Sequence, residues 1–171
     1  EFEACRISDY VGVTRLQGAG AKVLRDYVIN NSIVQNIGAQ GVLQGDHVDV
    51  IVNNIYLTNS TFINAEWIVR WNASVRTDLN SMLIESSTFY RAPYNNRFIL
   101  DVARTGSTIG SFTARNALFG FTTGGRSFNS RTPNTISSAN SFATSDAVWG
   151  TSATQGLPAA GIERSLLSSE E

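Results

Sequence analysis

The chain lacks several features that usually point to a class of protein. Its 171 residues include one cysteine and one histidine, and the formal net charge is -1. A single cysteine, Cys5, excludes an internal disulfide. So small a net charge gives no electrostatic reason to expect nucleic acid or an anionic membrane as a partner. No apolar run approaches the roughly 18 residues of a membrane-spanning helix, so no membrane-spanning segment is expected.

A short phrase, in contrast, recurs along the chain at nearly constant intervals. It ends on an apolar residue, and successive copies lie 27, 28, 27, 30 and 23 positions apart. A period of this length is typical of a stacked repeat protein. The phrases end at Ile7, Val34, Phe62, Phe89, Phe119 and Phe142, which we expect to form one buried column.

Each repeat contains two alternating apolar segments that are out of phase, such as Met82/Ile84 and then Ser87/Phe89. Alternation predicts strands, and the change of phase predicts a sharp bend between them. Asparagine suits a bend because it tolerates the left-handed backbone conformation and can bond to stacked copies of itself. The bends fall at Asn30-Asn31, Thr58-Asn59, Glu85-Ser86 and Arg115-Asn116. An inward column of mostly small residues follows them at Cys5, Ser32, Ser60, Ser87, Ala117 and Asn140, with Ser137 three positions before the last.

A third strand is expected about ten residues later in each repeat, at 41–44, 66–71 and 97–102. An offset of 31 aligns the last two segments. It places Trp67, Val69 and Trp71 over Phe98, Leu100 and Val102 on the buried face. The outward face then carries Glu66, Ile68 and Arg70 over Arg97, Ile99 and Asp101.

These patterns predict an all-β fold, a parallel β-helix or solenoid, and the resemblance given below implies that it is right-handed. It would have about five to six coils of about 27 residues, with three strands per coil. We expect residues 1–150 to form the β-helix and residues 151–171 to form a C-terminal tail or cap. The chain starts inside a repeat, at Phe2 and Cys5, so we expect a fragment that lacks upstream coils. Open ends expose unpaired strand edges, which leaves end-to-end self-association open.

The Asn-(Ser/Cys)-x-Phe phrase, with Asn at the bend, resembles the pectate-lyase superfamily of right-handed parallel β-helix proteins over about residues 2–150. The repeated phrase is also similar to that of uncharacterised secreted β-helix proteins of polysaccharide-degrading Bacteroidetes. The resemblance implies a secreted or cell-surface location and a polysaccharide partner. It does not choose among the activities that β-helices host.

No complete catalytic constellation is present, so the catalytic residues stay unknown. Polysaccharide lyases of this superfamily use an Arg or Lys base, and their calcium sites use several clustered carboxylates. Asp46 and Asp49 are too few for a calcium cage, and we expect no metal and no cofactor. His47, between them, is either a base or metal ligand or part of an ordinary loop.

The outward face of the third strand is the best surface candidate. Glu66 would oppose Arg97, and Arg70 would oppose Asp101, with Arg104 and Tyr94 in flanking loops. Guanidinium groups can hold carboxylates and aromatic rings can stack on sugars, so these six residues are candidates for substrate binding. The same charges could simply stabilise neighbouring strands.

We therefore expect a carbohydrate-associated protein that binds polysaccharide and is noncatalytic in this segment. One alternative is a polysaccharide lyase acting on uronate-containing glycans, with Arg70 or Arg97 as the base. The other is a structural stalk or adhesin, in which the repeats act as a spacer.

Overall fold

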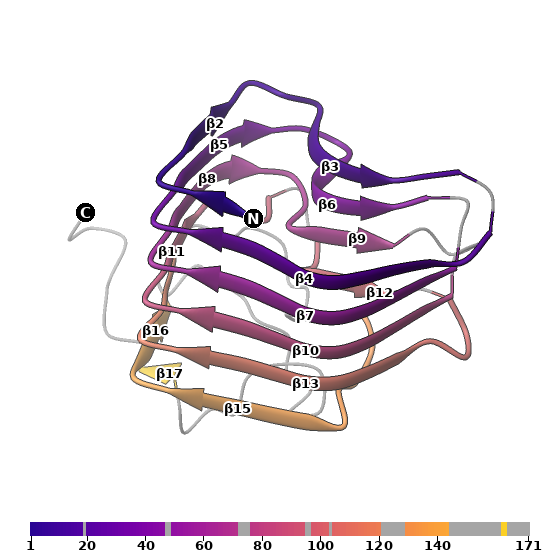
Figure 1. Ribbon diagram of the computed structural model, residues 1–171. Coiled ribbons are helices and arrows are strands. Elements are labelled where there is room, and N and C mark those ends of the chain that lie inside the picture. The colour runs from indigo at the N-terminus through magenta and orange to yellow at the C-terminus, as the bar shows by residue number, and fades with distance from the viewer. Residues whose placement is uncertain are drawn as a thin grey trace.

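The computed structural model describes residues 1–18, 20–46, 49–71, 76–94, 97–102, 104–120, 129–143 and 162–163. Every regular element in these ranges is a β-strand, and the strands form three parallel sheets (Figure 1). The long sheet contains, in spatial order, β1 (Phe2–Glu3), β4 (Lys22–Asn30), β7 (Val50–Thr58), β10 (Thr77–Glu85), β13 (Thr108–Arg115) and β15 (Thr135–Ala139).

The second sheet contains β2 (Arg6–Ser8), β5 (Ile33–Ile37), β8 (Thr61–Ala65), β11 (Thr88–Tyr90), β14 (Leu118–Gly120), β16 (Ser141–Ala143) and β17 (Ile162–Glu163). The third sheet contains β3 (Gly12–Leu16), β6 (Gly41–Gly45), β9 (Val69–Trp71) and β12 (Leu100–Val102).

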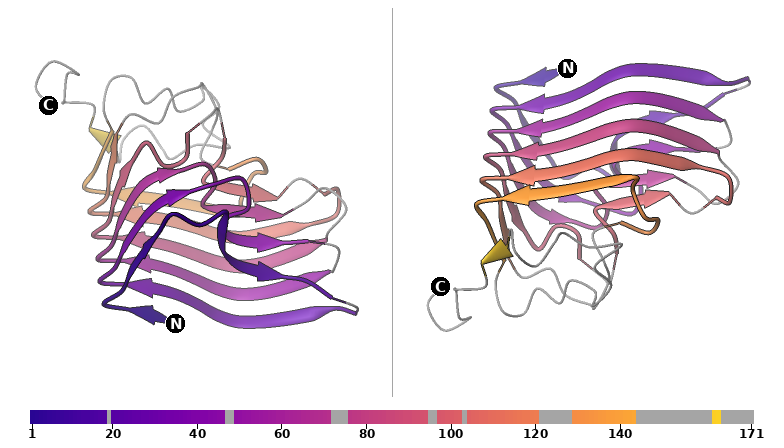
Figure 2. Two further views of the ribbon diagram at one scale, coloured as in Figure 1. Left: turned by 90° about the horizontal axis from the view of Figure 1, so that it is seen from above. Right: turned by 90° about the horizontal axis from the view of Figure 1, so that it is seen from below.

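The chain visits the long, second and third sheets in turn and then starts the next coil, which makes a parallel β-solenoid (Figure 2). Coils 1 to 4 (β1–β3, β4–β6, β7–β9 and β10–β12) have all three strands. Coils 5 and 6 contribute β13–β14 and β15–β16 to the described residues. Three strands per coil is thus confirmed, and four of the six coils have all three strands within the described residues.

Stacked phenylalanines fill the interior behind the second sheet. The rings of Phe62 and Phe89 lie 4.6 Å apart between centroids, and those of Phe89 and Phe119 lie 5.3 Å apart. All three side chains are fully buried, with Val34 also buried in the preceding coil. Each such burial contributes about 1.5–3 kcal/mol, and the stacking of each pair adds about 0.5–1.5 kcal/mol.

The predicted column was wrong in its last coil. Phe142 pairs with Leu118, while Ala143 takes the position opposite Phe119. Likewise Ala114 pairs with Ser138 rather than Ser137. The left-handed bend lies at Asn140, with φ of 48°, so Ser141 and not Asn140 is equivalent to Ala117. Bend geometry therefore fixes the register here, although it removes a Phe from the column.

The first bend has the same hydrogen bonds in successive coils. Asn31, Asn59, Ser86 and Asn116 all have φ between 49° and 52°. The next residue donates its N–H to the serine hydroxyl one coil further on, as Cys5 does to Ser32 (3.1 Å), Ser32 to Ser60 (3.0 Å) and Ser60 to Ser87 (3.1 Å).

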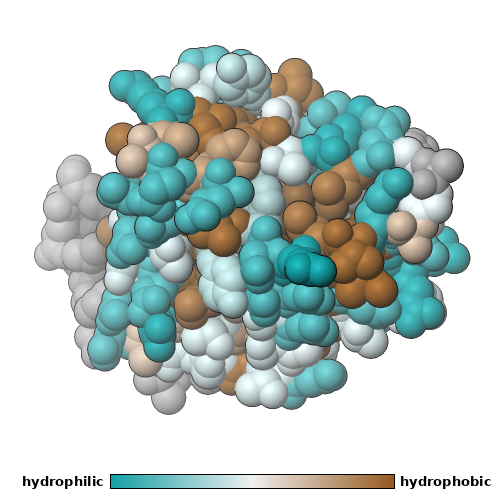
Figure 3. Space-filling view, viewed as in Figure 1, coloured by the Kyte–Doolittle hydropathy of each residue, from teal (hydrophilic) through white to brown (hydrophobic). Residues whose placement is uncertain are grey.

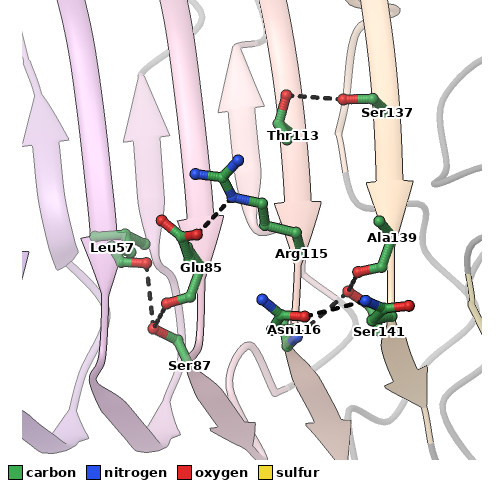
Figure 4. A network of polar contacts seen from close by, with 11 residues as sticks. Leu57, Glu85, Ser87, Thr113, Arg115, Asn116, Ser137, Ala139 and Ser141 are labelled. Atoms are coloured by element: carbon green, nitrogen blue, oxygen red, sulfur yellow. Dashed lines mark hydrogen bonds and ion pairs between the residues drawn. The ribbon is translucent and has the colours of Figure 1, made fainter.

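Each of these serine hydroxyls also donates to a carbonyl two residues earlier, as Ser87 and Ser141 do in Figure 4. The Cys5 thiol makes the same kind of bond, to the Glu3 carbonyl at 3.1 Å. Cys5 packs against the hydrophobic core, which confirms it as a small inward residue of this column.

A second bend, which the sequence analysis missed, joins the second sheet to the third. Asp9, Asn36, Asn64 and Arg91 have φ of 65°, 55°, 51° and 49°. The Asn36 amide donates to the Asp9 carboxylate at 2.8 Å, and the Asn64 amide donates to the Asn36 oxygen at 3.2 Å. These bonds make a second side-chain ladder along the solenoid.

The third sheet has the predicted offset of 31, with Arg70 opposite Asp101. Val69, Trp71, Leu100 and Val102 are buried as expected. Ile68 and Ile99 were expected outside, yet both are fully buried. The strands begin only at Val69 and Leu100, so the residues before them do not follow the alternation of a strand.

The serine ladder predicts a large effect for Ser60→Ala. Loss of the hydroxyl leaves the buried Ser32 N–H without an acceptor, so the free energy of unfolding should fall by about 1–3 kcal/mol. Ser111→Ala, on the outer face of the long sheet, is the control and should change it by less than about 0.5 kcal/mol. Urea unfolding of both variants measures the difference, and equal effects would contradict the role of the ladder.

Candidate functional site

The charged residues expected on the third-sheet face contact each other and the main chain. Arg97 lies 3.4 Å from the Glu66 carboxylate. Arg70 donates to the Ala39 carbonyl at 2.7 Å, and its register partner is Asp101. These contacts favour cross-strand stabilisation, the alternative left open above, for Glu66, Arg70 and Arg97.

Trp67 lies beneath two of these side chains. The guanidinium carbons of Arg70 and Arg97 are 4.9 Å and 4.6 Å from the centre of its ring. Trp67 is buried, as predicted, but it stands outside the main hydrophobic core, whereas Trp71 lies within it. Both guanidinium groups therefore make cation–π contacts to Trp67. They are the two groups that would be the base if the protein were a polysaccharide lyase.

The Asp46–Asp49 loop contains ion-pair and backbone contacts. Asp46 is buried and pairs with Arg15, and Asp49 accepts the N–H of Arg76 at 3.1 Å. His47 lies outside the described residues. Among the residues that are described, no three His, Cys, Asp or Glu side chains gather as a metal site would require.

Two predicted site residues lie elsewhere. Arg104 is exposed and its carbonyl accepts a bond from Arg131 at 2.6 Å. Tyr94 lies after the second bend, where its N–H bonds to the Ala65 carbonyl at 3.1 Å. Tyr94 lines an open concavity.

This concavity, the corner groove, follows the second bend where the second-sheet strands end. Its volume is about 570 Å³. One polar bend residue from each of coils 1 to 4 lines it, and these are Asp9, Asn36, Asn64 and Arg91. Tyr10, Val11, Ile37, Gly38 and Tyr94 complete the lining.

The groove combines amide groups, aromatic rings and two opposite charges. Tyr10 is 60% exposed and Val11 63% exposed. These two belong to a small number of large hydrophobic side chains that reach the surface; hydrophobic and hydrophilic side chains alternate over the face shown in Figure 3. Hydrogen bonds from Asn36 and Ser8 lower the pKa of Asp9, aided by the charge of Arg6, so its carboxylate is ionised at neutral pH.

Arg91 departs from the pattern of its column. Its φ of 49° is a conformation that asparagine tolerates and arginine disfavours, at a cost of about 1–2 kcal/mol. Its guanidinium group has no hydrogen bond or ion pair with the parts of the chain that are described. The groove thus has a cation in coil 4, three coils from the Asp9 carboxylate.

The recurrence of Asp9, Asn36 and Asn64 at intervals of 27 and 28 could have revealed this bend from the sequence. Arg91 lies at the same interval after Asn64, but it is not an asparagine or an aspartate. This change of residue type concealed the column in the sequence. Tyr10 carries no signal in the repeat.

The fold and groove together define a parallel β-solenoid protein with an open, polar and aromatic groove along one corner. Residues 1–65 match a protein family described as Domain of unknown function (DUF4957). No curated protein and no solved structure matches the chain. The part of the chain that the structure describes contains no helix long and apolar enough to cross a membrane.

The Asp9–Asn36 bond predicts a shifted titration. Because the folded pKa is lowered, the bond stabilises the fold above the ordinary carboxyl value of 3.8 and is lost as the pH falls through the folded pKa. The carboxyl carbon of Asp9 should titrate by NMR with a midpoint below 3.8, and Asn36→Ala should raise that midpoint. An unchanged midpoint in Asn36→Ala would refute the assigned cause.

Proposed function

We propose that this protein is a secreted or cell-surface polysaccharide-binding β-helix, noncatalytic in this segment, whose corner groove holds the glycan. The observation that carries the proposal is an open groove in which Arg91, whose guanidinium has no partner among the described residues, lies with Tyr94 and with the bend residues Asn36 and Asn64. The resemblance to the pectate-lyase superfamily supplies the link to carbohydrate.

Each part of the groove can contact a sugar chain. Tyr10 and Tyr94 offer aromatic faces for the apolar side of a pyranose ring. The amides and the Asp9 carboxylate can bond to hydroxyls, and Arg91 can pair with a carboxylate of the glycan. Specific polar groups beside aromatic surface are the usual composition of a ligand site.

The regular spacing of the polar residues in the groove also suits an extended polymer. The column supplies one polar residue per coil at a spacing of about 4.8 Å, and an extended polymer could contact several in succession. Asn36 and Asn64 are needed for the bend, so they would take part with their remaining hydrogen-bonding capacity.

Arg91→Asn separates binding from folding. Asparagine suits the left-handed bend, so the free energy of unfolding should rise by about 1 kcal/mol. Binding to an acidic polysaccharide on a glycan array should weaken by about tenfold or more, because a charge-assisted contact of about 1.5–3 kcal/mol is lost. Arg25→Asn, which removes the same charge from the exposed face of β4, is the matched control.

Tyr94→Ala should weaken binding by about tenfold, which equals about 1.4 kcal/mol. Loss of binding in Arg97→Ala with no loss in Arg91→Asn and Tyr94→Ala would move the site to the third-sheet face and overturn the groove proposal. Retention of binding in all three variants would exclude both surfaces.

A further inference from the structure

The described lining of the corner groove carries two opposite charges, and they lie in different coils. Asp9 belongs to coil 1 and Arg91 to coil 4. The uncharged bend residues Asn36 and Asn64 lie in the coils between them. Three coil spacings of about 4.8 Å separate the two charged positions by about 14 Å along the solenoid. This distance is longer than one pyranose ring, so a glycan that follows the groove presents different sugars to the two charges.

The Asp9 carboxylate is exposed and can accept further hydrogen bonds. Its Oδ1 accepts from the Asn36 amide at 2.8 Å, and a hydrogen bond from Ser8 also lowers its pKa. The two oxygens of a carboxylate offer about four acceptor positions in total. Asp9 can therefore accept from a sugar hydroxyl. An ionised Asp9 has no proton to donate, so it cannot bond to an acid group of the glycan.

The cation nearest to Asp9 in the sequence makes its own contact. Arg6 contributes to the lowered pKa of Asp9, but its guanidinium donates to Gln35 at 3.4 Å and is not part of the groove lining. Salt screens exposed charges over a Debye length of about 8 Å at physiological ionic strength. Asp9 therefore repels an acid group that lies beside it much more strongly than one held by Arg91, three coils away.

The second bend can be kept without the charge of Asp9. The Asn36 amide needs an acceptor in coil 1, and the amide oxygen of an asparagine would supply one. Asn36 itself accepts from the Asn64 amide in this way, at 3.2 Å. Asparagine also suits the left-handed backbone of this column, as Asn36 and Asn64 show. The charge at this position is thus available for a task other than folding.

We propose that the corner groove selects glycans in which acidic sugars are separated by neutral ones, with one acid group at Arg91 and a neutral sugar at Asp9. This inference rests on the proposed function, since it assigns a substrate class to the same groove. A glycan that is acidic at every sugar gains the contact with Arg91 only by placing another acid group beside Asp9. Repulsion of the wrong ligand then adds to the attraction of the right one.

Asp9→Asn tests the inference, because it removes the charge and keeps the bend. Titration calorimetry at low ionic strength compares matched hexasaccharides of galacturonate, and separately of glucuronate. One member of each pair has a free carboxylate on every sugar, and the other is methyl-esterified on all sugars but one. Asp9→Asn should raise the affinity for the fully charged member by about fivefold, the effect of removing a like charge at contact distance in water. The affinity for the singly charged member should stay level or fall, because an acceptor for hydroxyls is weakened.

Asp26→Asn is the matched control. Asp26 accepts from the Asn54 amide at 2.8 Å, as Asp9 does from Asn36, but it lies on the long sheet. The control removes the same charge and should leave the ratio of the two affinities unchanged. No change of this ratio in Asp9→Asn, or an equal change in both variants, would overturn the inference and leave the proposed function standing. Failure of the unsubstituted protein to bind any of the hexasaccharides would overturn both.

Discussion

The structure depends on a single left-handed residue per bend, held by hydrogen bonds to the coils before and after it. Asn31 and Asn59 turn the chain from the long sheet into the second sheet, and Asn36 and Asn64 turn it again toward the third. A left-handed residue reverses the parity of the alternating side chains across the bend. The phenylalanines can face the interior on one side because Ile29 and Leu57 face it on the other.

The ladders have a direction, and this direction accounts for where the carboxylates lie. Wherever an asparagine amide donates to a side chain of another coil in the described ranges, the acceptor lies in the preceding coil. The hydroxyls of Thr58 and Ser81 donate in the same direction, to Asn30 and Asn54. The first position of a ladder therefore needs only an acceptor. Glu3, Asp9 and Asp26 fill it, accepting from Asn30, Asn36 and Asn54 at 2.7–2.8 Å. Ionised carboxylates suit these positions because they have no proton to place.

The sequence predicted those parts of the fold that recur in successive coils. The period, the first bend, Cys5 and the stacked Phe62, Phe89 and Phe119 all follow from residue types that recur with the same physical task. The prediction for the sixth coil was wrong because Phe142 was aligned with Phe119 by residue type, and this match was given more weight than the bend at Asn140. The prediction that Ile68 and Ile99 are exposed was wrong because the alternation of a strand was extended beyond the ends of β9 and β12.

The candidate site was harder to predict for the opposite reason. Charges that oppose each other on neighbouring strands, such as Glu66 and Arg97, give a clear pattern, and that pattern is what a stabilising pair produces. A side chain that does not pair with a neighbouring strand leaves no such pattern. Tyr94 was found through its chemistry alone, and Tyr10 and Arg91 were not found.

Departures from the ladders are therefore the more informative positions in this solenoid. An arginine at φ of 49° disfavours the bend, while Ser86 and Ala117 remove bonds that their neighbours make. Repetition would supply a better residue for folding at each of these three positions, since asparagine or serine occupies them in other coils. The corner groove lies at one such substitution, where Arg91 stands in the column of Asn36 and Asn64. Among the described residues of the second bend, Arg91 is therefore the one whose identity the bend itself does not explain.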